Sequence, residues 1–129
     1  MAGLPRSGST LISSILNQNP EIYSSPNSPM CGMIFNLERS IIASEQYNAF
    51  PKPRVLPNVI TGVLENYYSD INKDIIIDKS REWSIKEHFE VLLRNLDNPP
   101  KIIMPVRNVL DIIASFINLV NKNGGKNNF

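Results

Sequence analysis

The sequence has one cysteine, almost no net charge and no long apolar run. Cys31 is the only cysteine, which excludes an internal disulfide framework and a zinc site built from several cysteines. The net charge of +1 provides no global field for nucleic acid or a membrane surface, so any anion site must be local. No apolar run approaches the roughly 18 residues of a membrane span, and the first residues lack the pattern of a signal peptide. By default we expect a cytoplasmic protein with no nucleic-acid partner and no membrane partner.

Apolar residues recur at helical spacing along most of the 129 residues. Two short aliphatic runs, DIIID (74–78) and KIIMPV (101–106), are instead typical of strands buried on both faces. The opening residues, MAGL (1–4), are expected to be a strand cut to a stub, and the polar tail 121–129 is expected to fray. Helices are predicted to cover the apolar stripes at 11–16, 30–41, 59–67, 85–96 and 109–120.

The alternation of strands and helices predicts an α/β fold in a single domain, with a parallel β-sheet and helices on both of its faces. Ligands of such sheets bind at the carboxyl ends of the strands. Each of the three predicted strand exits carries arginine or lysine, so we expect them to converge on an anion. These exits are GLPRSGST (3–10), DKSREW (78–83) and PVRNVLD (105–111).

The first exit has the glycine spacing of a phosphate-binding loop but a different cation. Gly3 and Gly8 are placed as in a Walker A loop, with Ser9 at the lysine position and Arg6 inside the loop. A glycine turn before a helix directs backbone N–H groups and the positive end of the helix dipole at one spot. With Arg6 as a permanent charge, this P-loop-like turn suits a tetrahedral dianion or a sulfuryl group. The plain alternative is a solvent-exposed turn with an incidental arginine. The loop residues predicted to bind the anion are Pro5, Arg6, Ser7, Gly8, Ser9 and Thr10.

Two motifs of this chain resemble those of a known enzyme family. GLPRSGSTLISSILNQNP (3–20) resembles the 5′-phosphosulfate loop of sulfotransferases that use 3′-phosphoadenosine 5′-phosphosulfate (PAPS), and is most similar to the branch that includes the tyrosylprotein sulfotransferases. The stretch PVRNVLDIIASFINL (105–119) resembles the family's 3′-phosphate motif, an arginine after a strand and a serine eight residues later. Arg107 and Ser115 have this spacing.

A third, weaker match is IIIDKSREW (75–83), because the family places a lysine at this strand exit and Lys79 fills the position. The resemblance implies that Arg6 and Lys79 are catalytic and that Arg107 and Ser115 bind the 3′-phosphate of PAPS. A cation at the bridging oxygen of the departing phosphate stabilises the transition state more than the ground state. The scheme requires no metal. Family domains are much longer, so the resemblance implies that residues 1–129 are an incomplete, N-terminal cofactor-binding part of the domain.

The general base of the family is not matched in this sequence. Asn27 occupies the position of a glutamate in the tyrosylprotein branch, and Arg81 that of a histidine in the cytosolic branch. Neither side chain is a base at neutral pH. The substitutes considered are Asp78, Glu82 and His88.

Each of these substitutes has a structural interpretation as well. Asp78 is expected to orient Lys79 or to cap the next turn, and Glu82 is expected to be a first-turn helix acid. His88 flanks an apolar stripe, which favours a packed histidine over a catalytic one. Packing roles are likewise favoured for Trp83 and for the buried thiol of Cys31.

Three functions are compatible with these motifs. The leading hypothesis is a PAPS-dependent sulfotransferase that acts on an acceptor, expected to be a hydroxyl. The first alternative is a P-loop-like small-molecule kinase, which needs an acid at a strand end to hold magnesium, and Asp78 is its best candidate. The second is a non-catalytic nucleotide-binding fragment. The motifs specify neither the acceptor nor the oligomeric state.

Overall fold

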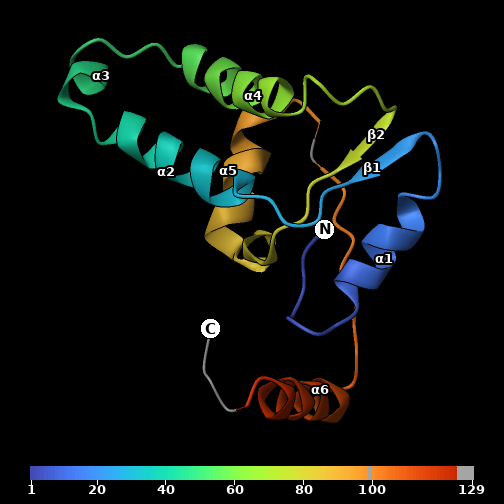
Figure 1. The fold of residues 1–129 in the computed structure, drawn as a ribbon. Coiled ribbons are helices and arrows are strands. Elements are labelled where there is room, and N and C mark those ends of the chain that lie inside the picture. The colour runs from blue at the N-terminus through green and yellow to red at the C-terminus, as the bar shows by residue number, and fades with distance from the viewer. Residues whose placement is uncertain (99, 125–129) are drawn as a thin grey trace.

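The computed structural model describes residues 1–98 and 100–124. Helices dominate it, and its two strands are short (Figure 1). The elements in chain order are α1 (Ser9–Leu16), β1 (Ile22–Ser24), α2 (Met30–Ile42), α3 (Glu45–Ala49), α4 (Val55–Tyr67), β2 (Ile75–Ile77), the 3-10 helix η1 (Arg81–Ser84), α5 (Lys86–Asn95) and α6 (Val109–Lys122). Within the described ranges, no helix has both the length and the apolar character needed to cross a membrane.

The two strands pair in parallel, with Tyr23 opposite Ile76, so the chain has an α/β arrangement. Backbone hydrogen bonds continue this pairing beyond the strands, where Ser28 N–H donates to the carbonyl of Lys79 at 2.8 Å. Strand β2 lies within the predicted run 74–78, but its expected burial on both faces is wrong, because a sheet of two strands leaves Ile75 and Ile76 50% and 38% exposed. Strand β1 was not predicted, because three residues are too few to show an alternating pattern.

Two of the predicted strands do not form, so the prediction of strands at 1–4 and 101–106 is wrong. Both segments are extended, but they are joined to their neighbours by isolated backbone hydrogen bonds rather than by a ladder. The carbonyl of Met1 accepts from Ser80 N–H at 3.1 Å, and Ala2 N–H donates to the carbonyl of Ile103 at 3.0 Å. Pro105 has no N–H to extend the pairing. These bonds nevertheless place the start of the chain between the segments that follow β2 and that precede α6.

The helices match the predicted stripes closely, with differences at their ends and one addition. Helix α4 begins at Val55, inside the proline-rich connection, and Pro57 is tolerated there because first-turn N–H groups have no helical acceptor. The short α3 was not predicted. Helix α6 extends to Lys122, so the expected fraying at 121 and 122 is wrong. Residues 125–129 of the predicted tail lie outside the described residues.

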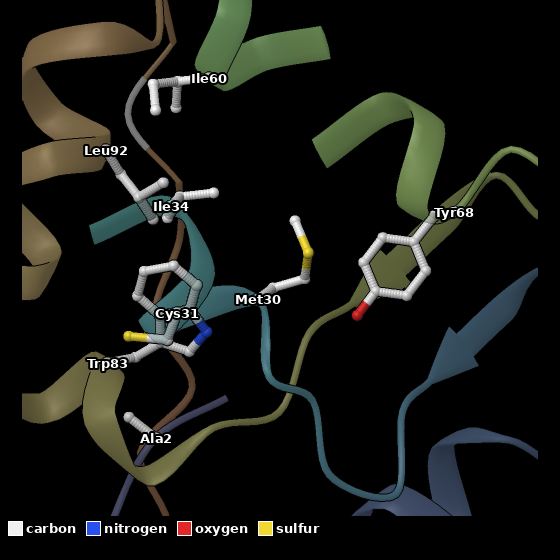
Figure 2. Close-up of a cluster of buried hydrophobic side chains, with 8 residues drawn as sticks. All are labelled: Ala2, Met30, Cys31, Ile34, Ile60, Tyr68, Trp83 and Leu92. Carbon is white, nitrogen blue, oxygen red and sulfur yellow. The ribbon is translucent and has the colours of Figure 1, made fainter. Parts of the chain in front are cut away.

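The core lies among α2, α4, α5 and η1 (Figure 2). Met30 and Ile34 of α2 are fully buried at its centre, and Ile60 of α4 is fully buried beside them. Burying such a side chain contributes roughly 1.5–3 kcal/mol, so this cluster holds the three helices together. Its buried members are Ala2, Met30, Cys31, Ile34, Ile60, Tyr68, Trp83 and Leu92.

Helix α6 stands apart from this core, whereas α1 packs against β1 (Figure 1). Asn108 begins α6, because its side-chain oxygen accepts a hydrogen bond from Leu110 N–H at 2.9 Å. Ile112 is the buried residue of this helix, while Leu110 is 74% exposed. Since α6 makes little apolar contact with the other helices, the polar contacts of Arg6 and Arg107 at its N-terminal half are important for its position.

Candidate functional site

The loop before α1 has an unusual backbone conformation. Gly8 is the residue before the helix and has φ of 99°, and Arg6 has φ of 65° although it is not glycine. A left-handed conformation costs a non-glycine residue about 1–2 kcal/mol, and such strain is concentrated at functional sites. No side chain in the described part of the chain caps α1. The first-turn N–H groups of α1 are therefore free of side-chain acceptors.

Open space surrounds Gly8, since an added Cβ would meet no atom within 4 Å. The glycine is therefore required by its positive φ rather than by crowding within the chain. At Gly3, both the positive φ of 133° and crowding require glycine, because an added Cβ would lie 3.3 Å from the carbonyl oxygen of Pro105. The two glycines thus set the shape of the loop and its distance from the segment before α6.

The structure brings the three cationic exits together. Lys79 Nζ donates to Thr10 Oγ1 at 3.1 Å, which joins the exit of β2 to the first turn of α1. Arg6 Nε donates to Ser115 Oγ at 2.9 Å, which joins the loop to α6. Arg107 Nη1 donates to the carbonyl of Arg6 at 3.2 Å. The side chains that the sequence pointed to, from three distant segments, therefore form one connected group.

Two cavities lie beside this group. The first, of about 370 Å³, is lined by Pro5 of the loop and by Lys79 and Asn27 among others. The second, of about 210 Å³, is lined by Arg6, Gly8, Ser9, Thr10, Arg107 and Ser115. Both cavities are lined by Arg6, Ser9 and Thr10, so they border the same part of the loop.

The electrostatics of both cavities favours an anion. Arg6, Lys79, Arg81 and Arg107 contribute cations, and none of the described residues that line either cavity is acidic. The carboxylate of Asp111, on the exposed side of α6, lies 3.9 Å from Arg107 Nε. A chain with a net charge of +1 thus places four cations around two neighbouring cavities.

Ser7 differs from the other loop residues predicted to bind the anion. Its side chain is buried, its hydroxyl has no hydrogen-bond partner among the described residues, and it lines neither cavity. Its backbone N–H donates to the carbonyl of Leu4 at 3.2 Å, which closes the turn. The backbone of Ser7 therefore helps to shape the loop, and its hydroxyl lines neither cavity.

Lys79 is partly buried, and this burial lowers the pKa of its amine below the ordinary value of a lysine. The amine is therefore expected to lose its proton at a lower pH than an ordinary lysine does. Competitive acetylation at a series of pH values, read by peptide mass spectrometry, measures that midpoint. A midpoint at or above that of an ordinary lysine would contradict this prediction.

The structure gives the position and the contacts of each candidate for the missing general base. Asn27 and Arg81 line the larger cavity, but neither is a base. Asp78 does not orient Lys79, because its carboxylate accepts hydrogen bonds from the Tyr68 hydroxyl and, at 2.6 Å, from Trp83 Nε1. This partly buried carboxylate joins α4 to η1, and the sequence alone could not identify its two partners.

His88, Glu82 and Trp83 lie away from the two cavities. The ring of His88 lies on that of Phe35, with centroids 4.0 Å apart, which agrees with the packed interpretation. Trp83 is buried in the core and lines neither cavity. The sequence also missed Phe116 and Leu119, which line the larger cavity from α6. Apolar residues at this spacing are typical of a core face and give no chemical signal.

Comparisons of this chain with protein-family models, with curated proteins and with solved structures found no match. The interpretation of the site therefore rests on its residues, their geometry and the resemblance of their motifs.

Proposed function

We propose that this chain binds PAPS on a P-loop-like fold and transfers the sulfuryl group to an acceptor hydroxyl. The observation that carries the proposal is the group of four cations around two neighbouring cavities, which no acidic side chain of the described residues lines. A nucleotide with a phosphosulfate at one end and a 3′-phosphate at the other needs two such anion subsites. The loop before α1 supplies donors for one subsite, and Arg107 and Ser115 at the start of α6 supply donors for the other.

In this proposal the first-turn N–H groups of α1 hold the 5′-phosphosulfate, with Ser9 and Thr10 as hydroxyl donors. Arg107 and Ser115 hold the 3′-phosphate through charge-assisted hydrogen bonds. Arg6 lies between the two subsites, because its Nε already contacts Ser115 while its carbonyl contacts Arg107. Its remaining guanidinium donors are available for the bridging oxygen.

The transfer itself exchanges one bond for another at sulfur. The acceptor oxygen forms a bond to sulfur while the bond from sulfur to the bridging phosphate oxygen breaks, and that oxygen keeps the electron pair. The acceptor proton is released to solvent. Arg6 stabilises the growing negative charge on the bridging oxygen, and Lys79, held beside Thr10, assists from the exit of β2.

The kinase alternative is less favoured by the geometry. It requires an acidic side chain at a strand end to hold magnesium, and Asp78 was the candidate. Both carboxylate oxygens of Asp78 already accept hydrogen bonds, from Tyr68 and Trp83. Using Asp78 for a metal would break both contacts and leave buried donors without partners.

Thermal unfolding with different nucleotides tests the proposal. Adenosine 3′,5′-bisphosphate without magnesium should stabilise the chain by about 2.7 kcal/mol at about 100 times its Kd. For a chain of this size that is a rise in Tm of roughly 10 °C. Arg107→Gln should abolish most of the rise, whereas Arg54→Gln, an exposed arginine away from the cavities, should leave it unchanged. Stabilisation by ATP with magnesium but not by the 3′-phosphorylated nucleotide would overturn the proposal.

A second measurement separates the enzyme from the non-catalytic fragment. The chain is incubated with PAPS labelled in the sulfuryl group and with a mixture of hydroxyl acceptors. Transfer of label supports the enzyme. Stabilisation by the nucleotide with no transfer to any acceptor supports the binding fragment instead.

A further inference from the structure

Three potential metal ligands meet outside the two cavities of the anion site. Cys31 lies on α2, Glu82 on η1 and His88 on α5. Cys31 Sγ is 3.4 Å from His88 Nδ1, and that nitrogen is 3.9 Å from Glu82 Oε2. All three ligand atoms lie within 4.8 Å of one another. None of the three residues has a role in the proposed transfer.

We propose that Cys31, Glu82 and His88 bind a divalent transition-metal ion of the zinc class. Zinc takes thiolate, imidazole and carboxylate ligands at about 2.3, 2.0 and 2.0–2.2 Å in a tetrahedron. From these bond lengths, neighbouring ligand atoms lie roughly 3.3–3.6 Å apart. The distance of 3.4 Å between Cys31 and His88 lies within this range, and the distance of 3.9 Å between His88 and Glu82 must shorten by roughly 0.3–0.6 Å. A single cysteine suffices for such a site, because the fold supplies the other ligands from a histidine and a carboxylate.

The site is closed on one side and open on the other. Cys31 is fully buried, and the side chain of His88 is 16% exposed, whereas that of Glu82 is 51% exposed. Glu82 also lines a cavity of about 470 Å³, together with Ser28, Asn36 and Arg81 among others. An ion can therefore enter from this cavity, which also has space for a water as the fourth ligand.

Gly32 leaves space beside α2 for the carboxylate of Glu82. A Cβ on this residue would lie 3.3 Å from Glu82 Oε2, so a side chain there would press on the ligand atom. A glycine inside a helix costs roughly 0.5–1 kcal/mol relative to alanine. Its position in α2 is therefore explained by the approach of Glu82 rather than by helix propensity.

The charges around Cys31 also suit a cation, because the carboxylate of Glu82 lies in the same group of ligand atoms. A divalent ion bound there displaces the thiol proton and offsets the negative charge of that carboxylate. The ring of His88, packed on Phe35, already directs Nδ1 toward Cys31 and Glu82.

Titration with Co²⁺ tests the proposal on the full chain after treatment with a chelator. One equivalent of Co²⁺ should produce the near-ultraviolet absorption of a thiolate–cobalt bond, and one equivalent of Zn²⁺ should remove it. Glu82→Gln should weaken Zn²⁺ binding at least about 100-fold, since changes in outer-shell residues alone cost 10- to 100-fold. Glu45→Gln, an exposed glutamate on α3, should bind as the unaltered chain does.

Two further variants keep the test decisive if Cys31→Ser fails to fold. Gly32→Ala should lower Zn²⁺ affinity while far-UV circular dichroism stays unchanged, because the flexible end of Glu82 must move. His88→Gln should abolish the cobalt absorption. Absence of thiolate–cobalt absorption in the unaltered chain would overturn the proposal. So would Zn²⁺ binding that survives Glu82→Gln undiminished, which would identify an isolated histidine contact. Neither result bears on nucleotide binding, because Cys31, Glu82 and His88 line neither of the two cavities proposed to hold the nucleotide.

Discussion

Arg6→Ala is expected to lower the rate of sulfuryl transfer about 100- to 1,000-fold while nucleotide affinity falls far less. Removing one donor aimed at a developing negative charge typically costs this much, because the charge grows only in the transition state. Arg107 keeps its hydrogen bond to the backbone carbonyl at position 6, so Arg107 and the first turn of α1 still hold the nucleotide in its ground state. Single-turnover rates with labelled PAPS, compared with Kd values from calorimetry, measure the two effects separately.

The strained backbone of Arg6 requires a matched control for this experiment. Arg6→Gly removes the same guanidinium but also relieves the positive φ of 65°. It should lose transfer as fully as Arg6→Ala and show a higher Tm than that variant. Arg54→Ala removes an exposed arginine and should change neither transfer nor affinity. Equal losses of transfer and of affinity in Arg6→Ala would show that Arg6 only binds the nucleotide.

Glu38→Ala is expected to destabilise the fold by about 2–4 kcal/mol, because it breaks a buried polar network. Glu38 on α2 is 3% exposed, and its carboxylate accepts hydrogen bonds from Arg94 Nη2 and Asn95 Nδ2, each at 2.7 Å. Without it, the buried amide of Asn95 keeps only the carbonyl of Val91 as its acceptor. Equilibrium unfolding in urea measures the loss as a lower midpoint at an unchanged slope.

Glu90→Ala provides the comparison, since Glu90 also approaches Arg94, at 3.8 Å, from an exposed position on the same helix. Exposed pairs of this kind contribute about 0.3–0.5 kcal/mol. The difference between the two variants therefore isolates the effect of burial. Similar losses in both would show that Glu38 contributes no more than a surface ion pair.

The helices of this fold could be predicted from apolar spacing, because each has a face that packs on others. The sheet could not be predicted to the same extent. The aliphatic run at 74–78 contains β2, but the similar run at 101–106 stays extended without a ladder, although Ile102 and Met104 are no more exposed than Ile75 of β2. A run of apolar residues shows that a segment can pair, whereas the partner is set by the rest of the fold.

Much of the candidate site could be predicted, because cationic residues at strand exits converge wherever parallel segments end at one edge. The orientation of the side chains could not be predicted. The loop pattern predicts the same role for Ser7 and Ser9, yet Ser9 lines both cavities, whereas Ser7 is buried and lines neither. The group of Cys31, Glu82 and His88 was equally hidden. Its members belong to three elements, and only the packing of α2 on α5 brings them together.

The hydrogen bond between Arg6 and Ser115 joins residues 109 positions apart, and that between Lys79 and Thr10 spans 69. Closing so long a loop has an entropic cost that grows with its length, and these exposed polar contacts return little free energy against it. The helical core around Met30, by contrast, closes shorter loops and buries apolar surface. The core is therefore expected to assemble first and the anion site last, so that the nucleotide stabilises the final and weakest step of folding.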